Sequence, residues 1–150
     1  MSVDYIDRVE DAVRACNAEV IAVRPDSLVI DAAREMSERR AGIALVCAED
    51  GRIVGVLSER DIVRALIDNL RRLSSLLVSQ ISTENPNTCC LEDDIREIIH
   101  KMIKGGFRHM PIIENGKVVG VVEQQELLAY LLSQAEQEQK AFALSHLDYL

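Results

Sequence analysis

The chain alternates between short apolar runs and longer stretches that have one apolar face. The runs "EVIAVRP", "GIALVC" and "RIVGVL" are rich in Val and Ile and indicate short β-strands. Residues 28–39 place their apolar side chains on one face of a helix, which Asp26 or Ser27 is expected to cap. A second helix is expected from Ser58 to about residue 70, so the order is β-α-β-β-α.

This order occurs twice, because the sequence repeats itself. The segment "DGRIVGVLSERDIV" (50–63) aligns with "NGKVVGVVEQQELL" (115–128), and "DAAREMSERRAGIALVC" (31–47) aligns with "EIIHKMIKGGFRHMPII" (97–113). Asp50-Gly51 and Asn115-Gly116 predict a hairpin turn in each copy. In the second copy "TCC" indicates a short strand, a helix over 92–104 is expected to stop at Gly105-Gly106, and the last helix begins near Gln124.

The repeat predicts an α/β (α+β) fold in which two small units bury their apolar sheet faces against each other. Terminal stretches with apolar stripes, such as Val3, Ile6, Val9, Val13 and Cys16, indicate helices that cover the core or a subunit interface, or else form a partner-binding groove. The predicted segments are an N-terminal helix at 1–18, unit one at 19–70, a linker at 71–81, unit two at 82–132 and a helical tail at 133–150.

Charge and composition restrict the function. The net charge of −8 and pI of about 4.9 make nucleic acid an unfavourable partner, because a phosphate backbone would be repelled. No apolar run reaches the roughly 18–20 residues that span a bilayer, and the acidic N-terminus does not resemble a signal peptide. The sequence therefore predicts a cytoplasmic protein without membrane insertion.

Cysteine and histidine spacing predicts no metal site, since Cys16, Cys47, Cys89 and Cys90 form no C-x-x-C pair and the three histidines are scattered. The vicinal pair Cys89-Cys90 leaves a redox role open. Buried or half-buried thiols in a cytosolic protein are the alternative.

The two copies differ most at the start of their last helix, where "GVLSERD" in the first copy faces "GVVEQQE" in the second. Ser58 and Asp61 have the spacing of a capping box, in which a hydroxyl and an acid satisfy backbone N–H groups at the helix start. That role needs no ligand. A strand that turns directly into a helix also leaves N–H groups and a positive dipole end at the sheet edge, where phosphates and sugars bind.

A ligand gives these side chains a second use. The Asp61 carboxylate could accept hydrogen bonds from two vicinal ribose hydroxyls, and Ser58 could donate to a phosphate oxygen. In the second copy "FRHMP" offers Arg108, whose planar fork suits phosphate, and His109. Each residue alone also fits a structural role, Arg108 as a solvated charge and His109 as a hydrogen-bonded strand residue.

The doubled β-α-β-β-α unit, with "GVLSERD" and "RHMP", resembles a tandem pair of cystathionine-β-synthase (CBS) domains, a Bateman module, over about residues 19–132. The resemblance implies clefts for adenosine-containing ligands such as AMP, ADP, ATP, NAD(H) or S-adenosylmethionine, and pairing of modules into dimers. It also implies roles for individual residues. Asp61 would hold the ribose, Ser58 would lie beside phosphate, basic residues of the "RHMP" strand would contact phosphate, and strand-end main chain would contact the base. The implied site comprises Ser58, Asp61, Arg108, His109, Pro111, Ala22, Val23, Val56 and Leu57.

The second copy departs from this pattern, because Glu123 and Glu126 replace the small polar residues and Glu123 adds a negative charge where phosphate would lie. One working site is therefore expected, and the other is expected to stay empty or to take an uncharged ligand. A nucleotide sensor that acts on an unknown effector protein is the favoured function, with no cofactor required. The alternative is a structural dimerisation adaptor. An enzyme is not expected, because nothing pairs a nucleophile with a base.

Overall fold

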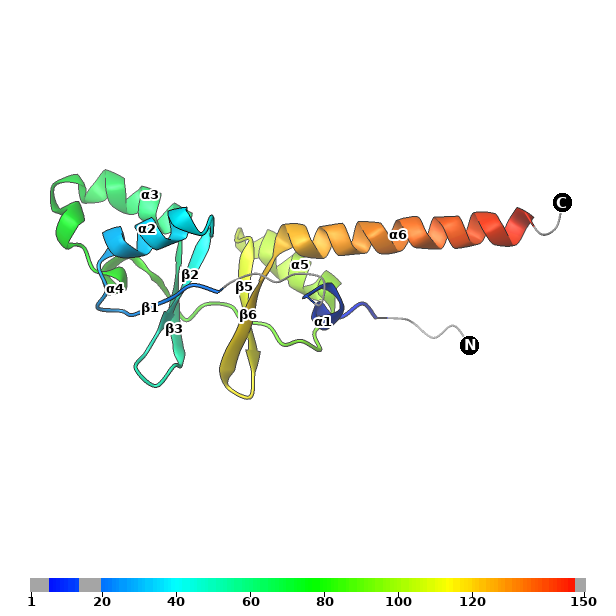
Figure 1. Cartoon of the computed structure of the whole chain (residues 1–150), viewed down its shortest axis with the longest axis horizontal. Helices are drawn as coiled ribbons and strands as arrows, with labels where there is room; N and C mark the ends of the chain where they lie inside the picture. The colour runs from blue at the N-terminus through cyan, green and yellow to red at the C-terminus, as the bar shows by residue number, and fades with distance from the viewer. Residues whose placement is uncertain (1–5, 14–19, 148–150) are drawn as a thin grey trace. The chain divides into compact units, whose positions relative to one another are not determined.

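The structure is a computed structural model that describes residues 6–13 and 20–147 (Figure 1). The chain divides into two compact units. The sheet unit comprises the described residues within 18–89 and 110–121, and the helical unit comprises those within 1–17, 90–109 and 122–150. The first copy of the repeat thus lies in the sheet unit, whereas the second copy contributes to both units.

The sheet unit contains a four-stranded sheet in the order β1-β2-β3-β4. β1 runs parallel to β2, whereas β2, β3 and β4 are antiparallel neighbours. The elements are β1 (Ala22–Val23), α2 (Val29–Glu38), β2 (Ile43–Cys47), β3 (Ile53–Ser58), α3 (Glu59–Asp68), the 3₁₀ helix η1 (Leu70–Ser75), α4 (Val78–Ile81) and β4 (Thr83–Glu84). The predicted β-α-β-β-α order of the first copy is confirmed.

The start of α2 differs from the expectation. Leu28 holds the N-cap position without a side-chain hydrogen bond, and the Ser27 hydroxyl instead accepts a backbone N–H of the preceding turn. The Val29 N–H donates to the Leu76 carbonyl at 2.9 Å. The predicted side-chain cap at Asp26 or Ser27 is therefore wrong, because backbone from a distant segment satisfies the helix start.

β4 is a two-residue strand that the sequence pattern did not predict. Thr83 pairs with Val56, and Glu84 pairs with Gly55, so β3 has a partner on both sides at this point. A Cβ atom added to Gly55 would lie 2.8 Å from the Thr83 carbonyl oxygen. Glycine at position 55 therefore allows the close approach of β4 to β3.

The second copy begins with a single bridge instead of a strand. Cys89 pairs in parallel with Ile112, at positions equivalent to the Val23–Val46 pair of β1 and β2. The copy continues with α5 (Ile95–Gly105), β5 (His109–Glu114), β6 (Lys117–Glu123) and α6 (Gln124–Leu147), with β5 and β6 paired. The weak strand signal of "TCC" corresponds to this one bridge.

The predicted turn and stop signals of the second copy are confirmed. α5 ends at Gly105, and its C-cap Gly106 adopts the left-handed conformation with φ 72°. Asn115 and Gly116 in the hairpin also have positive φ values, 53° and 77°. Two consecutive residues with positive φ suit the twist of a tight hairpin.

A short helix packs on each copy of the repeat, and in both cases this helix directly precedes the other copy in the sequence. α4 packs on the first copy, and α1 (Val9–Val13) packs on the second, with Val78 and Val9 fully buried at equivalent positions. The backbone hydrogen bonds match in pairs at 2.9 Å: Val29 to Leu76 and Ile95 to Asp7, Val78 to Ser27 and Val9 to Asp93, Ser79 to Pro25 and Glu10 to Leu91. The segment 71–81, predicted as a linker, thus supplies part of the core, and positions 3 and 16 of the predicted N-terminal helix lie outside the described residues.

The core is aliphatic in both units. In the sheet unit it includes Ile21, Val29, Ala44, Val46, Leu57 and Val78, and in the helical unit Val9, Ile95, Ile98, Met102, Val122 and Leu127. Among the described residues no polar or charged residue is buried. The mixed α/β class and the terminal helix are confirmed, whereas the sheet-to-sheet packing of the two copies stays a prediction.

Candidate functional site

The predicted pair Ser58 and Asp61 forms a complete capping box at the start of α3. The Asp61 N–H donates to Ser58 Oγ at 3.2 Å, and the Ser58 N–H donates to Asp61 Oδ2 at 2.9 Å. The Ser58 hydroxyl also donates to Oδ2 at 2.9 Å. The structural role considered from the sequence is therefore present, and it uses one of the two carboxylate oxygens.

The other carboxylate oxygen, Asp61 Oδ1, accepts a long hydrogen bond of 3.4 Å from the Thr83 hydroxyl. A carboxylate oxygen has two lone pairs, so Oδ1 retains capacity to accept a further hydroxyl. Thr83 comes from β4 and is exposed. Sequence reasoning missed Thr83, because only the pairing of β4 with β3 brings it to Asp61.

The N–H groups at the start of α3 are less available than expected. The Glu59 N–H donates to the Gly42 carbonyl at 3.1 Å, and the Asp61 N–H is used by Ser58. The expectation of free N–H groups is therefore wrong for Glu59 and Asp61, because β2 and the capping side chain already satisfy them. The start of α3 therefore offers fewer N–H groups to an anion than the sequence indicates.

The equivalent start of α6 keeps the backbone contact but changes the chemistry. The Glu126 carboxyl accepts a hydrogen bond from the Glu123 backbone, as Asp61 does from Ser58. Burial raises the pKa of Glu126, and the nearby Glu123 charge raises it further, whereas the backbone hydrogen bond lowers it. The expectation that Glu126 caps the helix fits this contact.

The side chains of His109 and Glu123 meet across the β5–β6 hairpin and form an ion pair when His109 is protonated. Their Nε2 and Oε1 atoms lie 3.3 Å apart, and their side chains are 23% and 44% exposed. In the first copy the aligned residues Ile43 and Ser58 also lie opposite each other. His109, predicted as a phosphate contact, thus has a carboxylate neighbour within its own copy.

Arg108 is exposed, and its carbonyl accepts the Gln124 N–H at 2.8 Å. The structure places Arg108 and His109 in the helical unit, whereas Ser58 and Asp61 lie in the sheet unit. The remaining predicted site residues, Ala22 and Val23 on β1, Val56 and Leu57 on β3, and Pro111 on β5, also lie in the sheet unit.

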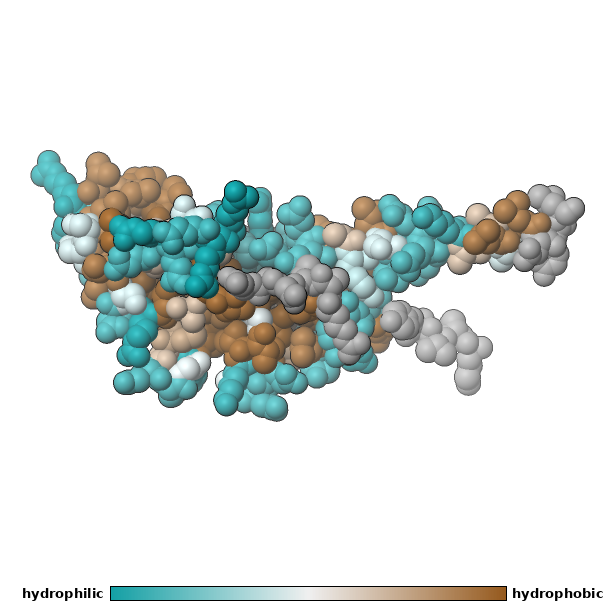
Figure 2. Space-filling view, viewed as in Figure 1, coloured by the Kyte–Doolittle hydropathy of each residue, from teal (hydrophilic) through white to brown (hydrophobic). Residues whose placement is uncertain are grey.

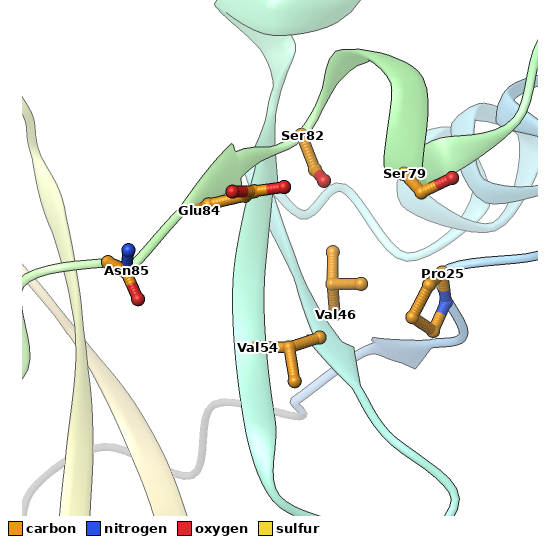
Figure 3. Close-up of a pocket in the computed structure, with 7 residues that line it drawn as sticks. All are labelled: Pro25, Val46, Val54, Ser79, Ser82, Glu84 and Asn85. Carbon is orange, nitrogen blue, oxygen red and sulfur yellow. The ribbon is translucent and has the colours of Figure 1, made fainter.

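A cavity of about 280 Å³ opens on the sheet unit beside β4 (Figure 3). Successive side chains of a strand alternate, so Ser82 and Glu84 line this cavity while Thr83 faces Asp61. The full lining is Pro25, Val46, Val54, Ser79, Ser82, Glu84 and Asn85. It carries one carboxylate and no basic side chain, so it offers no counter-charge to a phosphate.

The cysteine expectation is only partly met. Cys47 is half-buried and Cys89 is buried, but Cys90 is exposed. The prediction of a buried or half-buried thiol is wrong for Cys90, because Cys89 points into the core at its bridge with Ile112 and the next side chain points outward. Within residues 6–13 and 20–147 no His, Cys, Asp and Glu cluster is suited to a metal ion, and no helix could cross a membrane.

Comparison with known proteins identifies the family. The profile of the CBS domain matches residues 9–68 and 78–133, which covers both copies of the repeat. The chain belongs to the CBS-domain family and contains two tandem CBS repeats. The match to 9–68 includes α1, which agrees with its place as an equivalent of α4.

Solved structures of CBS proteins share the fold. A CBS-domain containing protein from Agrobacterium tumefaciens has a TM-score of 0.78 at 27% identity, covering 83% of this chain and 98% of that chain. A CBS domain protein from Pyrobaculum aerophilum, complexed with AMP, has a TM-score of 0.74 at 27% identity, covering 87% and 99%. A CBS domain-containing protein of Arabidopsis thaliana is 32% identical over 132 residues, 87% of this chain, and this chain spans only 23% of its length.

Proposed function

We propose that this chain is a regulatory module that binds an adenosine-containing nucleotide and transmits the binding to a partner protein. The observation that carries the proposal is the Asp61 carboxylate, whose Oδ1 is held beside Thr83 with capacity for further hydroxyl donors. The family membership and the AMP complex of the Pyrobaculum aerophilum relative support an adenosine ligand.

In this proposal Asp61 holds the ribose. Its Oδ2 is fixed by the Ser58 N–H and hydroxyl, so the carboxylate is oriented before the ligand arrives. Oδ1 then accepts from the vicinal ribose hydroxyls, as a charged acceptor that makes stronger hydrogen bonds than a neutral one. The Ser58 hydroxyl can turn from Asp61 to a phosphate oxygen.

The phosphate needs positive charge in an acidic protein. Arg108 supplies a planar donor fork at an exposed position, and His109 supplies a ring nitrogen that now lies against Glu123. Glu123 therefore competes with phosphate for His109. The base is proposed to contact the main chain at Ala22, Val23, Val56 and Leu57. Pro111, which closely follows His109 in the sequence, completes the proposed site.

The proposed output is a change in how the module pairs with other proteins. A nucleotide can shift such an equilibrium only through different affinities for the two states. The proposal includes a homodimer and an effector protein in the cytoplasm, with the nucleotide as a regulatory ligand and no required cofactor. Which of AMP, ADP, ATP or NAD(H) binds is the first point to measure.

One observation favours the alternative of a structural adaptor. The capping box of Ser58 and Asp61 is complete without a ligand, so both residues have a sufficient structural reason to be present. Under this alternative the module dimerises and docks on a partner, and nucleotides do not affect it.

The test is a thermal-shift panel of AMP, ADP, ATP, NADH and S-adenosylmethionine, with GTP as the control, followed by calorimetry. Asp61→Asn keeps an oxygen for the Ser58 N–H but removes the charge on the proposed ribose contact. Asp68→Asn, an exposed acid on the same helix, is the matched control. A ligand at a hundred times its Kd should raise stability by about 2.7 kcal/mol, a shift of several degrees.

Selective shifts with adenine ligands that persist in Asp68→Asn and disappear in Asp61→Asn would support the nucleotide sensor. A flat panel at millimolar ligand, or equal shifts in wild type and Asp61→Asn, would contradict it. The flat panel would leave the structural adaptor as the better account.

A further inference from the structure

The cavity beside β4 combines a recessed apolar floor with polar side chains around it. Its floor is formed by Val46, which is 1% exposed, and by Val54, which packs against the core of the sheet unit. By contrast, Ile67 on α3 is 79% exposed and lies on the outer surface, where Figure 2 shows apolar side chains gathered over this helix. A recessed floor lets an apolar group make contacts on several sides, which an outward surface does not.

The backbone around the cavity is held in place by hydrogen bonds. On one side the Ser79 N–H donates to the Pro25 carbonyl at 2.9 Å. On another side Glu84 pairs with Gly55 in the ladder between β3 and β4. A ligand would therefore meet lining residues whose backbone is already ordered, which lowers the entropic cost of binding.

The polar side chains that line the cavity have hydrogen-bonding capacity to spare. Within residues 6–13 and 20–147, the side chains of Ser79, Ser82, Glu84 and Asn85 form no hydrogen bond and no ion pair. Figure 3 shows the Glu84 carboxylate extending toward Ser82, above the two valines of the floor. These groups are therefore available to a ligand.

The repeat does not require this polar lining. Because α1 is the equivalent of α4, Ser79 corresponds to Glu10 and Ser82 corresponds to Val13. The backbone N–H groups of Ser79 and Glu10 make equivalent hydrogen bonds at 2.9 Å, although their side chains differ. The shared fold therefore explains the backbone of this segment and leaves the two serine hydroxyls without a structural reason.

The lining selects a ligand by charge and by size. Glu84 supplies a negative charge that no basic side chain of the cavity offsets. A primary ammonium has three N–H donors, which the Glu84 carboxylate, the Ser82 hydroxyl and the Asn85 amide oxygen can accept. The volume of about 280 Å³ lies just below the range of about 300–1,000 Å³ typical of drug-sized ligands, so it suits a smaller molecule than a nucleotide.

We propose that this cavity binds a small alkylammonium ion, with its charged end on Glu84 and its aliphatic chain on the valine floor. Binding here requires neither the nucleotide nor the partner of the proposed function. The ligand would contact β4, the strand that brings Thr83 to Asp61.

Titration of the full chain, labelled with ¹⁵N, by n-pentylamine tests the site by NMR in the absence of nucleotide. The amide signals of Val54, Ser82, Glu84 and Asn85 should shift and saturate. n-Pentanol and pentanoate have the same carbon chain with a neutral or a negative end. Each should bind at least about ten-fold more weakly, because the charge-assisted hydrogen bonds to Glu84 are lost.

Variants at Glu84 show whether its charge is responsible. Glu84→Gln keeps the shape of an exposed side chain but removes the charge, so it should weaken n-pentylamine binding at least about five-fold. Glu84→Lys should reverse the preference, so that pentanoate binds more tightly than n-pentylamine. Glu49→Gln, at an exposed position in the β2–β3 turn of the same unit, is the matched control and should stay within about two-fold of wild type.

The same spectra report whether each variant is folded. Shifts that do not saturate, shifts spread over other acidic surfaces, equal affinity for n-pentanol, or unchanged affinity in Glu84→Gln would each overturn the proposal. Because no nucleotide is present, failure here is distinguishable from failure of the nucleotide test at Asp61.

Discussion

The two copies of the CBS repeat place the same backbone contact at the start of their last helix but use different side chains for it. In the first copy Ser58 and Asp61 form the capping box, and in the second Glu126 accepts the hydrogen bond from the Glu123 backbone. The fold requires a hydrogen-bond acceptor for this N–H group, and the carboxylate of either an aspartate or a glutamate can provide it.

The difference lies in what remains after the fold is satisfied. In the first copy the equivalent residues, Ser58 and Ile43, are uncharged. The Asp61 carboxylate therefore lies beside Thr83 without a second charge from these two positions. In the second copy Glu123 brings a second negative charge, which engages His109 at the equivalent cross-strand position. The comparison teaches that packing tolerates this exchange, whereas affinity for an anionic ligand should not.

The largest expected effect concerns α1 and α4, the two short helices that each pack on the copy they do not precede. Val78→Ala and Val9→Ala each remove two methyl groups from fully buried equivalent positions, so each should lower the free energy of unfolding by about 2 kcal/mol. Chemical denaturation measures this change. Hydrogen exchange should then rise in α2 for Val78→Ala and in α5 for Val9→Ala, since each short helix packs on the copy it does not precede.

Val119→Ala is the control, because this side chain is 50% exposed and should change stability by less than about 0.5 kcal/mol. If hydrogen exchange instead rose in α5 for Val78→Ala, or in α2 for Val9→Ala, the packing of α4 on the first copy and of α1 on the second would be wrong.

A smaller effect separates the two helix starts. Ser58→Ala removes the hydroxyl that accepts the Asp61 N–H, so it should cost about 1 kcal/mol of stability. Glu123→Gln removes a partly exposed ion pair with His109, which contributes only about 0.2–1 kcal/mol. Thermal unfolding of both variants at pH 7 should therefore rank Ser58→Ala as the less stable.

Glu123→Gln should also change ligand affinity. Glu123→Gln releases His109, so phosphorylated ligands should bind about two- to five-fold more tightly by calorimetry, while adenosine should be unaffected. Equal changes for adenosine and AMP would show that Glu123 does not compete with phosphate.

The smallest effect is a pH dependence at Glu126. Its pKa is raised in the folded chain, so the folded state binds more protons than the unfolded chain above the ordinary glutamate pKa, and stability falls as the pH rises through this window. Glu126→Gln should therefore have a Tm on the order of a degree above wild type at pH 7. The difference should vanish below about pH 4, where both states of the wild type are protonated.

Differential scanning calorimetry across this pH range makes the comparison, with exposed Glu114→Gln as the control. A Tm difference between Glu126→Gln and wild type that grows toward acid pH would contradict the direction given for the pKa of Glu126.

Much of the fold follows from short-range pattern. The two hairpins and the stop of α5 depend on residues with positive φ, which the local sequence reveals. These residues are Gly51, Asn115, Gly116 and Gly106. The capping box of Ser58 and Asp61 spans only one helical turn, so its spacing alone predicts it. The repeat extended these local predictions to both copies.

Contacts between distant segments were decided by the tertiary structure. Thr83 reaches Asp61 only because β4 pairs with β3 beside Gly55, and a two-residue strand has too few positions to show a period. The side-chain cap expected at Asp26 or Ser27 is replaced by a backbone bond from Val29 to Leu76, which no local spacing encodes. The sequence by itself therefore determined the elements, their turns and the Ser58–Asp61 pair, because these depend on neighbours within one or two turns of chain. Only the tertiary structure placed α1 and α4 on the copies that they do not precede and identified the neighbours of each site residue. The energies of these contacts come from burial and hydrogen bonds between residues far apart in sequence.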